Sequence, residues 1–294
     1  KIIEEHAPEM IDEIKKYVAE GRWEVSASTW VETDKNMPNG ESLCRHISYT
    51  KKYLSELFDI DPDTLCVDYE PDTFGHAATV PEILQNGGVD YYYHCRGQKE
   101  DYVLYRYRAP SGAEVLMYRE PFWYNRAVEP DSGTGVFELE KLTGGLKTSL
   151  AVYGVGDHGG GPTRRDIEAA IDMQSWPIWP RVKFGTFLEF FREAESVREH
   201  LPILDRELNY IFNGCYTTQT RIKRGNRKSE LALREAEMWS VAAQDVKAYP
   251  AETLDKRWKH TLLNQFHDIL PGSHIAPVFR DAMADYREIE EKLT

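Results

Sequence analysis

Two strand-like runs joined by a short helical segment constrain the fold more than any other feature of this sequence. Residues 65–69 and 89–95 are apolar or aromatic and read as strands, and residues 80–84 begin a helix between them. A strand, a helix and a strand in this order are typical of α/β proteins. The segment therefore predicts a mixed α/β domain.

Further elements are expected on both sides of this unit. Residues 22–30 and 149–155 read as strands, and the second of these ends at a glycine-rich loop. Residues 102–108 and 113–118 flank a Pro-Ser-Gly turn signal, which predicts an antiparallel hairpin. Apolar side chains at helical spacing in residues 10–18, followed by a glycine, predict a helix before the first strand.

Three helical blocks follow residue 225, with no strand signal between them. In residues 257–269 an apolar stripe recurs every four residues, and Pro271 is expected to end that helix. His267 lies beside the stripe, so its side chain can face elsewhere. We therefore predict an α/β domain over residues 1–211 and a helical bundle over residues 212–294.

Charge and hydropathy exclude two classes of partner. The 294 residues carry a formal net charge of −13, which repels phosphate backbones and anionic lipid, so we expect neither nucleic acid nor a membrane as a partner. No apolar stretch approaches the roughly 20 residues that span a bilayer. The four cysteines form no CxxC pair, which favours reduced thiols and a cytoplasmic location.

Two loops that follow predicted strands contain acidic residues. Asp72 lies in the run Glu-Pro-Asp-Thr-Phe-Gly-His at residues 70–76, where a carboxylate at a strand end can be catalytic, although a turn or N-cap residue is the commoner role. Asp157 lies in Gly-Asp-His-Gly-Gly-Gly-Pro-Thr at residues 156–163, a loop whose backbone can approach a ligand closely. A plain flexible loop is the alternative there, and a phosphate cradle is disfavoured because the P-loop pattern is absent.

A third polar run, at residues 264–273, contains His267 and Asp268. An imidazole near the end of a helix can simply compensate the helix dipole. A neutral imidazole can equally bind a metal ion together with a carboxylate such as that of Asp72.

In this order, the three runs resemble glycoside hydrolase family 38, the α-mannosidases. Supporting matches are Gly-Arg-Trp-Glu at residues 21–24, Trp-Val-Glu at 30–32 and Tyr-Thr-Thr-Gln at 216–219. The resemblance covers nearly the whole chain. It implies an irregular seven-stranded (β/α) barrel-like catalytic domain, incomplete at its N-terminus and followed by a three-helix bundle.

The resemblance also implies roles for individual residues. Asp72 matches the nucleophile of a retaining glycosidase, which also binds Zn²⁺, and His267 matches the zinc ligand from the helical domain. Asp157 matches the acid/base, with His158 or Asp166 as fallbacks. The expected carbohydrate-binding residues are Arg96, Asp268 and Tyr124.

The expected substrate is a mannose-containing oligosaccharide or glycan, and homo-oligomerisation is left open. One departure from the family is that no His-x-Asp pair, the source of the remaining zinc ligands, precedes Gly21. We interpret this as truncation before that strand, so that activity is expected of the intact parent. The alternative is a non-catalytic or vestigial carbohydrate-binding protein, and a metal-dependent carbohydrate deacetylase is a weaker third candidate.

Overall fold

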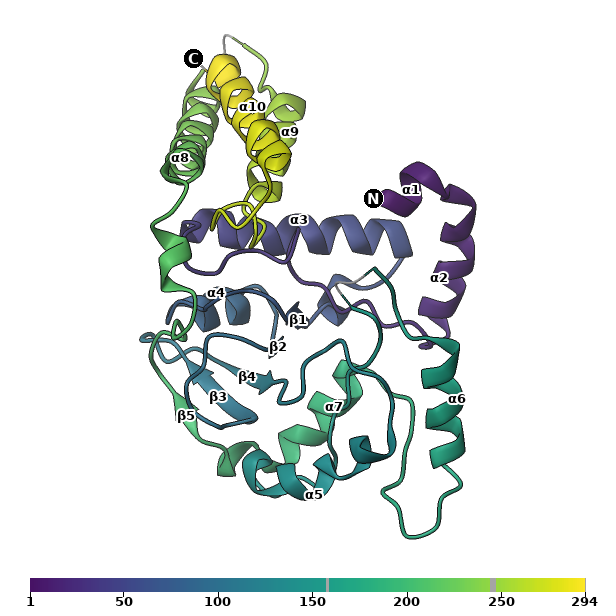
Figure 1. Ribbon diagram of the computed structural model, residues 1–294. Helices are drawn as coiled ribbons and strands as arrows, with labels where there is room; N and C mark the ends of the chain where they lie inside the picture. The colour runs from purple at the N-terminus through teal and green to yellow at the C-terminus, as the bar shows by residue number, and fades with distance from the viewer. Residues whose placement is uncertain (157–158, 244–246, 294) are drawn as a thin grey trace.

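The structure is a computed structural model that describes residues 1–156, 159–243 and 247–293. Figure 1 shows a mixed α/β body with a separate helical bundle beside it. The strands are β1 (Val67–Glu70), β2 (Tyr91–His94), β3 (Leu104–Arg108), β4 (Glu114–Arg119) and β5 (Ile203–Leu204). The helices are α1 (Ile2–His6), α2 (Ile11–Ala19), α3 (Gly40–Phe58), α4 (Val80–Asn86), α5 (Gly135–Leu139), α6 (Arg164–Met173), α7 (Phe187–Ala194), α8 (Thr220–Ala242), α9 (Ala251–Leu263) and α10 (Ala276–Leu293).

The five strands form one sheet in the order β1-β2-β4-β3-β5. Strands β1, β2 and β4 run parallel, and β3 is antiparallel to β4, as the predicted hairpin requires. The hairpin turn contains Gly112, whose φ of 92° lies in the left-handed region that glycine adopts without strain. The mixed α/β class is therefore confirmed.

The sheet has a hydrophobic core on each face, because successive side chains of a strand point to opposite sides. One core joins Leu116 and Tyr118 of β4 to Phe190 of α7. The other joins Val115 and Met117 of the same strand to α3 and α4. In Figure 1, α3 lies between the sheet and the helical bundle, whereas α5 and α7 lie on the opposite side of the sheet.

Helix α3, the longest helix of the α/β body, is absent from the sequence-based expectations. Its N-cap is Asn39, whose side chain accepts a hydrogen bond from the backbone N–H of Ser42 at 2.8 Å. The buried face includes Ser42, His46 and Thr50 as well as aliphatic residues. Three of its five buried residues are polar, so the buried face is not a continuous apolar stripe.

Two predicted strands are wrong: neither residues 22–30 nor residues 149–155 belong to the five-stranded sheet of the described residues. Residues 22–30 form no ladder with any described strand, and Glu24 accepts hydrogen bonds from the backbone of Phe187 and Leu188, both at 2.8 Å, at the start of α7. Among the described residues, the β pairing of 149–155 is an isolated bridge between Tyr153 and Arg126. Gly154, with φ of 130°, turns this segment away from extended geometry.

The predicted three-helix bundle is confirmed by α8, α9 and α10, which enclose a core around Trp258 and Tyr286. Helix α9 nevertheless ends at Leu263, well before Pro271. The reason is that the following residues pair with the α/β body: the backbone N–H of Asp34 donates to the carbonyl of Gln265 at 2.9 Å. No helix in the described ranges is both long and apolar enough for a membrane span.

Candidate active site

Three polar side chains follow the carboxyl ends of the three neighbouring parallel strands. Asp72 follows β1, Arg96 follows β2 and Tyr124 follows β4. Because parallel strands end at the same edge of a sheet, these side chains meet there, as active-site residues of α/β proteins commonly do. The Arg96 guanidinium donates to Oδ1 of Asp72 from Nη2 at 2.7 Å and from Nε at 3.2 Å, and the Tyr124 hydroxyl donates to Oδ2.

The loop that carries Asp72 is held by contacts to its backbone. Oε1 of Glu32 accepts hydrogen bonds from the backbone N–H groups of Asp72 at 2.5 Å and of Thr73 at 3.2 Å. At Gly75 a Cβ atom would lie 2.7 Å from Oδ1 of Asn209, so a larger residue would displace the loop. These contacts fix the direction in which the Asp72 carboxylate points.

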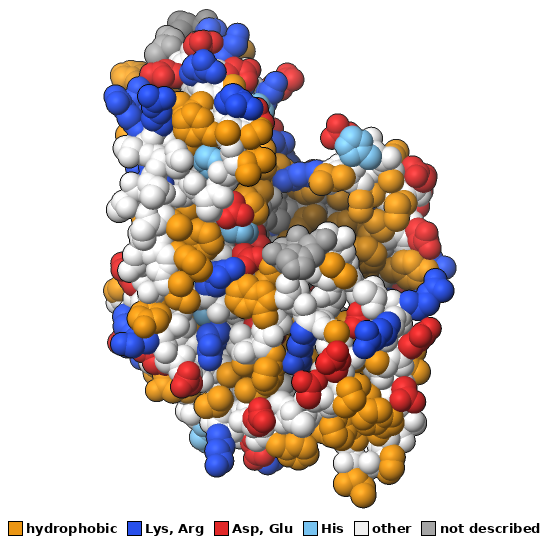
Figure 2. Space-filling model, in the orientation of Figure 1, with side chains coloured by type: hydrophobic (Ala, Val, Ile, Leu, Met, Phe, Trp, Pro, Cys, Tyr) orange, Lys and Arg blue, Asp and Glu red, His pale blue; other side chains and the backbone are white. Residues whose placement is uncertain are grey.

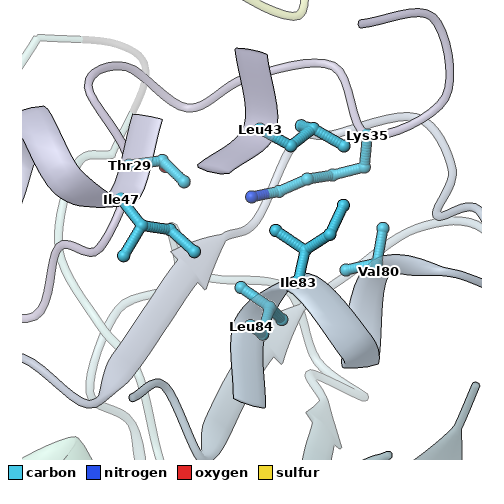
Figure 3. Close-up of a pocket in the computed structure, with 7 residues that line it drawn as sticks. All are labelled: Thr29, Lys35, Leu43, Ile47, Val80, Ile83 and Leu84. Atoms are coloured by element: carbon cyan, nitrogen blue, oxygen red, sulfur yellow. The ribbon is translucent and has the colours of Figure 1, made fainter. Parts of the chain in front are cut away.

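A buried ion-pair network lies behind this loop. Nζ of Lys35 lies 2.8 Å from Oδ2 of Asp68 and 2.9 Å from Oε1 of Glu70. Burial raises the pKa of Glu70 well above its ordinary value, against the opposing attraction of Lys35. Figure 3 shows Lys35 extending between α3 and α4 beside a cavity of about 10 Å³, which has room for roughly one water molecule and none for a sugar.

The helical bundle contributes His267 and Asp268 to the same region. The backbone N–H and Nδ1 of His267 lie 3.1 Å and 2.9 Å from the carbonyl oxygen of Glu32, so Nδ1 donates there and Nε2 is the unprotonated ring nitrogen. Oδ2 of Asp268 lies 4.0 Å from Nε2. Burial lowers the pKa of His267, which favours the neutral imidazole that metal ions bind.

These residues surround a cavity of about 470 Å³, within the size range of small-molecule sites. Figure 2 shows the surface hollowed between the helical bundle and the side of the molecule that carries α1 and α2. The cavity walls combine charged groups with aromatic rings, which can stack on sugar faces. The lining residues are Glu32, Tyr69, Pro71, Asp72, Phe74, Arg96, Tyr124, Gly156, Phe266, His267 and Asp268.

Sequence reasoning assigned no role to Glu32, which lines the cavity. The pKa of Glu32 is raised from 4.5 to about 8, mainly by burial and also by the nearby Asp72 charge, while hydrogen bonds from two backbone N–H groups oppose the rise. In the sequence, Glu32 was noted only as the last residue of the Trp-Val-Glu run at residues 30–32, which resembles family 38. Its contacts join residues far apart in the chain, which spacing along the sequence does not reveal.

Sequence reasoning also missed the aromatic surroundings of Arg96. The guanidinium carbon lies 4.5 Å from the ring centre of Trp123 and 5.1 Å from that of Phe212, so cation–π contacts add to its pairing with Asp72. Trp123 has a φ of 72°, a strained conformation for a bulky residue. Strain at this position, next to Tyr124, is typical of functional sites.

Five of the six predicted site residues line the cavity: Asp72, Arg96, Tyr124, His267 and Asp268. Asp157, the predicted acid/base, lies outside the described residues, as does its fallback His158. The second fallback, Asp166, caps α6 through Thr163 and accepts a hydrogen bond from the backbone N–H of Val128 at 3.0 Å. Those contacts give Asp166 a structural role at the helix N-terminus.

Within the described ranges, three ligating side chains come close enough to share a metal ion only at His260, Asp285 and Glu288, in the helical bundle. At the cavity, the carboxylate of Asp72 and Nε2 of His267 are of the donor types that Zn²⁺ takes. They provide two ligands, whereas a catalytic zinc usually has three from protein. The donor set therefore fits part of a zinc site.

Comparison with models of known protein families shows which family this chain belongs to. Residues 2–207 match the model of the glycosyl hydrolases family 38 N-terminal domain. The chain belongs to glycosyl hydrolase family 38. Residues 210–294, which include His267, match the model of the alpha mannosidase middle domain.

Two curated alpha-mannosidases illustrate the match. The chain is 30% identical to alpha-mannosidase G of Dictyostelium discoideum over 97% of its own length, and covers 27% of that protein. It is 30% identical to alpha-mannosidase 2C1 of Homo sapiens over 96% of its length, and covers 28% of that protein. The chain thus spans about a quarter of the length of the curated relatives that it matches.

Solved structures show the same fold. An alpha-mannosidase from Enterococcus faecalis V583 superimposes with a TM-score of 0.77 at 20% identity, over 97% of this chain and 34% of that one. A 4-alpha-glucanotransferase from Thermococcus litoralis superimposes with a TM-score of 0.61 at 13% identity, over 99% of this chain and 52% of that one. At such identities the likeness concerns the fold alone.

Proposed function

We propose that the protein containing this chain is a retaining α-mannosidase, with Asp72 as its nucleophile, Asp157 as its acid/base and a mannose-containing glycan as its substrate. The observation that carries this proposal is the convergence of Asp72, Arg96 and Tyr124 at one sheet edge, around a cavity that His267 and Asp268 complete from the helical domain. The alpha-mannosidases among its relatives support the choice of mannose.

The position of Asp72 suits a nucleophile. Its carboxylate faces a cavity large enough for a sugar, and Arg96 and Tyr124 hold its two oxygens so that little reorganisation is needed before attack. In the first step an oxygen of Asp72 bonds to the anomeric carbon while the bond from that carbon to the leaving oxygen breaks. The product is a glycosyl ester of Asp72.

Asp157 would complete each half of the reaction. In the first step it gives its proton to the leaving oxygen, and in the second it takes a proton from the water molecule that attacks the glycosyl ester and frees Asp72. Retaining glycosidases place their two carboxyl groups roughly 5–5.5 Å apart. Gly156, which precedes Asp157 in the sequence, lines the cavity, and this supports the assignment.

Asp72 and His267 are the residues of this chain that would hold Zn²⁺. When bound there, the ion would supply Lewis-acid polarisation and bind sugar hydroxyl oxygens. His267 is prepared for this role because its Nδ1 proton is donated to the carbonyl of Glu32, which directs Nε2 to be the ligand. Aromatic rings of Tyr69 and Phe74 would contact the apolar faces of the sugar.

Turnover of p-nitrophenyl α-mannoside by the full-length protein tests the proposal, with Asp72→Asn as the nucleophile variant. We expect hydrolysis by the wild type and a loss of kcat of about 10³-fold or more in the variant, since the amide cannot form the ester. Equal rates would reject Asp72 as the nucleophile. Mannoside binding without turnover by the wild type would instead favour the vestigial carbohydrate-binding protein.

A further inference from the structure

Glu32 contacts both halves of the candidate active site with different parts of the same residue. Its side chain reaches the loop after β1, and its main chain reaches the segment after α9. Glu32 thus contacts the proposed nucleophile Asp72, which lies in the N-terminal domain, and the proposed zinc ligand His267, which lies in the middle domain.

The side chain of Glu32 holds Asp72 by its backbone. One carboxylate oxygen accepts the N–H groups of Asp72 at 2.5 Å and Thr73 at 3.2 Å, so two consecutive peptide planes are fixed by one acceptor. A carboxylate that binds adjacent N–H groups restrains the backbone torsions between them. The backbone of Asp72 is therefore held in place, and this positions its side chain for the contacts with Arg96 and Tyr124.

The main chain of Glu32 holds His267 in the same way. The Glu32 carbonyl oxygen lies 3.1 Å from the backbone nitrogen of His267 and 2.9 Å from its Nδ1. The next residue extends this contact: Thr33 forms an isolated antiparallel bridge with Phe266, and its hydroxyl donates to the carbonyl of Gln265 at 3.0 Å. The segment that contains Glu32 is thus joined directly to the segment that contains His267.

We propose that Glu32 is a positioning residue that sets the place of Asp72 relative to His267 and to the bound sugar. This inference rests on the proposed function, because it assigns Glu32 to the nucleophile of that reaction. Glu32 also lines the cavity, so its truncation changes the lining of the proposed sugar site. Loss of such supporting hydrogen bonds typically costs about 10–100-fold in activity or metal affinity.

Two variants of the full-length protein separate positioning from general stability. In Glu32→Ala both N–H groups lose their acceptor, and kcat is expected to fall by about 10–100-fold, more than any change in KM. In Glu32→Gln an amide oxygen of the same reach remains, and activity within a few-fold of the wild type is expected. A Gln variant as slow as the Ala variant would overturn the positioning role.

Glu24→Ala is the matched control, because Glu24 also accepts two consecutive backbone N–H groups, those of Phe187 and Leu188, away from the cavity. It should lower the melting temperature without lowering kcat. If Glu24→Ala and Glu32→Ala reduce kcat equally, the effect of Glu32 is general stability and the inference fails.

Crystal structures of the wild type and Glu32→Ala give a readout that does not depend on activity. We expect the Asp72 carboxylate to be displaced in the variant and its 2.7 Å contact with Arg96 to be lost. An unchanged Asp72 position overturns the inference, whether or not the protein cleaves mannosides. A wild type without turnover would overturn the proposed function, and the crystal comparison would still decide the role of Glu32.

Discussion

Asp72 shows how a single carboxylate acquires its place from distant parts of a sequence. Its side chain meets Arg96 and Tyr124 after two other strands, and its backbone meets Glu32, which is 40 residues away in the sequence. None of these contacts lies within the run that identifies Asp72. The local sequence supplies the residue, and the parallel order of β1, β2 and β4 supplies its neighbours.

Glu120, which follows β4 on the path to Tyr124, gives a prediction about pH. Burial raises its pKa from 4.5 to about 7, opposed by hydrogen bonds from the backbone of Phe122 and the hydroxyl of Tyr93. A raised pKa means that the folded state binds the proton more tightly than the unfolded state. Stability from this group is therefore full below pH 4.5 and is lost as pH rises through 7.

Glu120→Gln should remove this dependence, because the amide is neutral at every pH and retains an acceptor oxygen. Between pH 4 and pH 8, the free energy of unfolding of the variant is expected to gain about 3 kcal/mol relative to the wild type. Urea unfolding at both pH values measures it. A difference between the two proteins that stays constant with pH would contradict the assignment.

At the candidate site, the resemblance to family 38 predicted six residues from the sequence, and five of them line the cavity. It did not reach Glu32 or the rings of Trp123 and Phe212 that enclose Arg96. Those roles depend on which loops pack together in three dimensions. Whether Asp157 is the acid/base stays a prediction.

At the scale of elements, the sequence predicted most strands of the sheet and the three helices of the bundle. β1, β2, the hairpin and the bundle helices were predicted from their apolar and aromatic residues, which contribute to the three hydrophobic cores. Helix α3 was not predicted; polar Ser42, His46 and Thr50 are three of its five buried residues. Residues 22–30 and 149–155 have strand-like composition, but β structure also needs a paired neighbour, which composition does not specify.

The end of β1 offers a prediction about buried charge. Lys35 is 2% exposed and pairs with Asp68 and Glu70 on that strand. Lys35→Met keeps the aliphatic stem but leaves two buried carboxylates without their cation. We expect the free energy of unfolding to fall by about 3–5 kcal/mol, the usual cost of breaking a buried ion pair from one side.

Lys259→Met is the control for that variant. Lys259 pairs with Asp255 at 2.8 Å on the surface of α9, where solvent screens the charges. Its loss should change the free energy of unfolding by less than about 1 kcal/mol. Chemical denaturation of both variants measures the contrast. Similar small losses in the two would show that the network around Lys35 contributes little.

At the scale of the whole molecule, the helical bundle and the α/β body share a buried carboxylate. Glu230 on α8 accepts hydrogen bonds from the backbone N–H of Asn39 at 2.8 Å, the hydroxyl of Ser42 at 3.0 Å and the amide of Gln265 at 3.0 Å. The first two donors belong to the start of α3, and the third lies next to the segment of His267. Glu230 therefore couples the position of the bundle to both parts of the site.

Glu230→Ala should weaken that coupling. Three buried donors lose one acceptor, so we expect the free energy of unfolding to fall by about 3 kcal/mol. Because the lost contacts lie between the two parts, the bundle should then unfold separately from the α/β body, and a single calorimetric transition of the wild type should become two.

Glu235→Ala, an exposed change on the same helix, should keep one transition at nearly the wild-type temperature. A single, merely lowered transition in Glu230→Ala would mean that other contacts, such as the 2.7 Å pair between Arg45 and Glu237, suffice to hold the bundle in place.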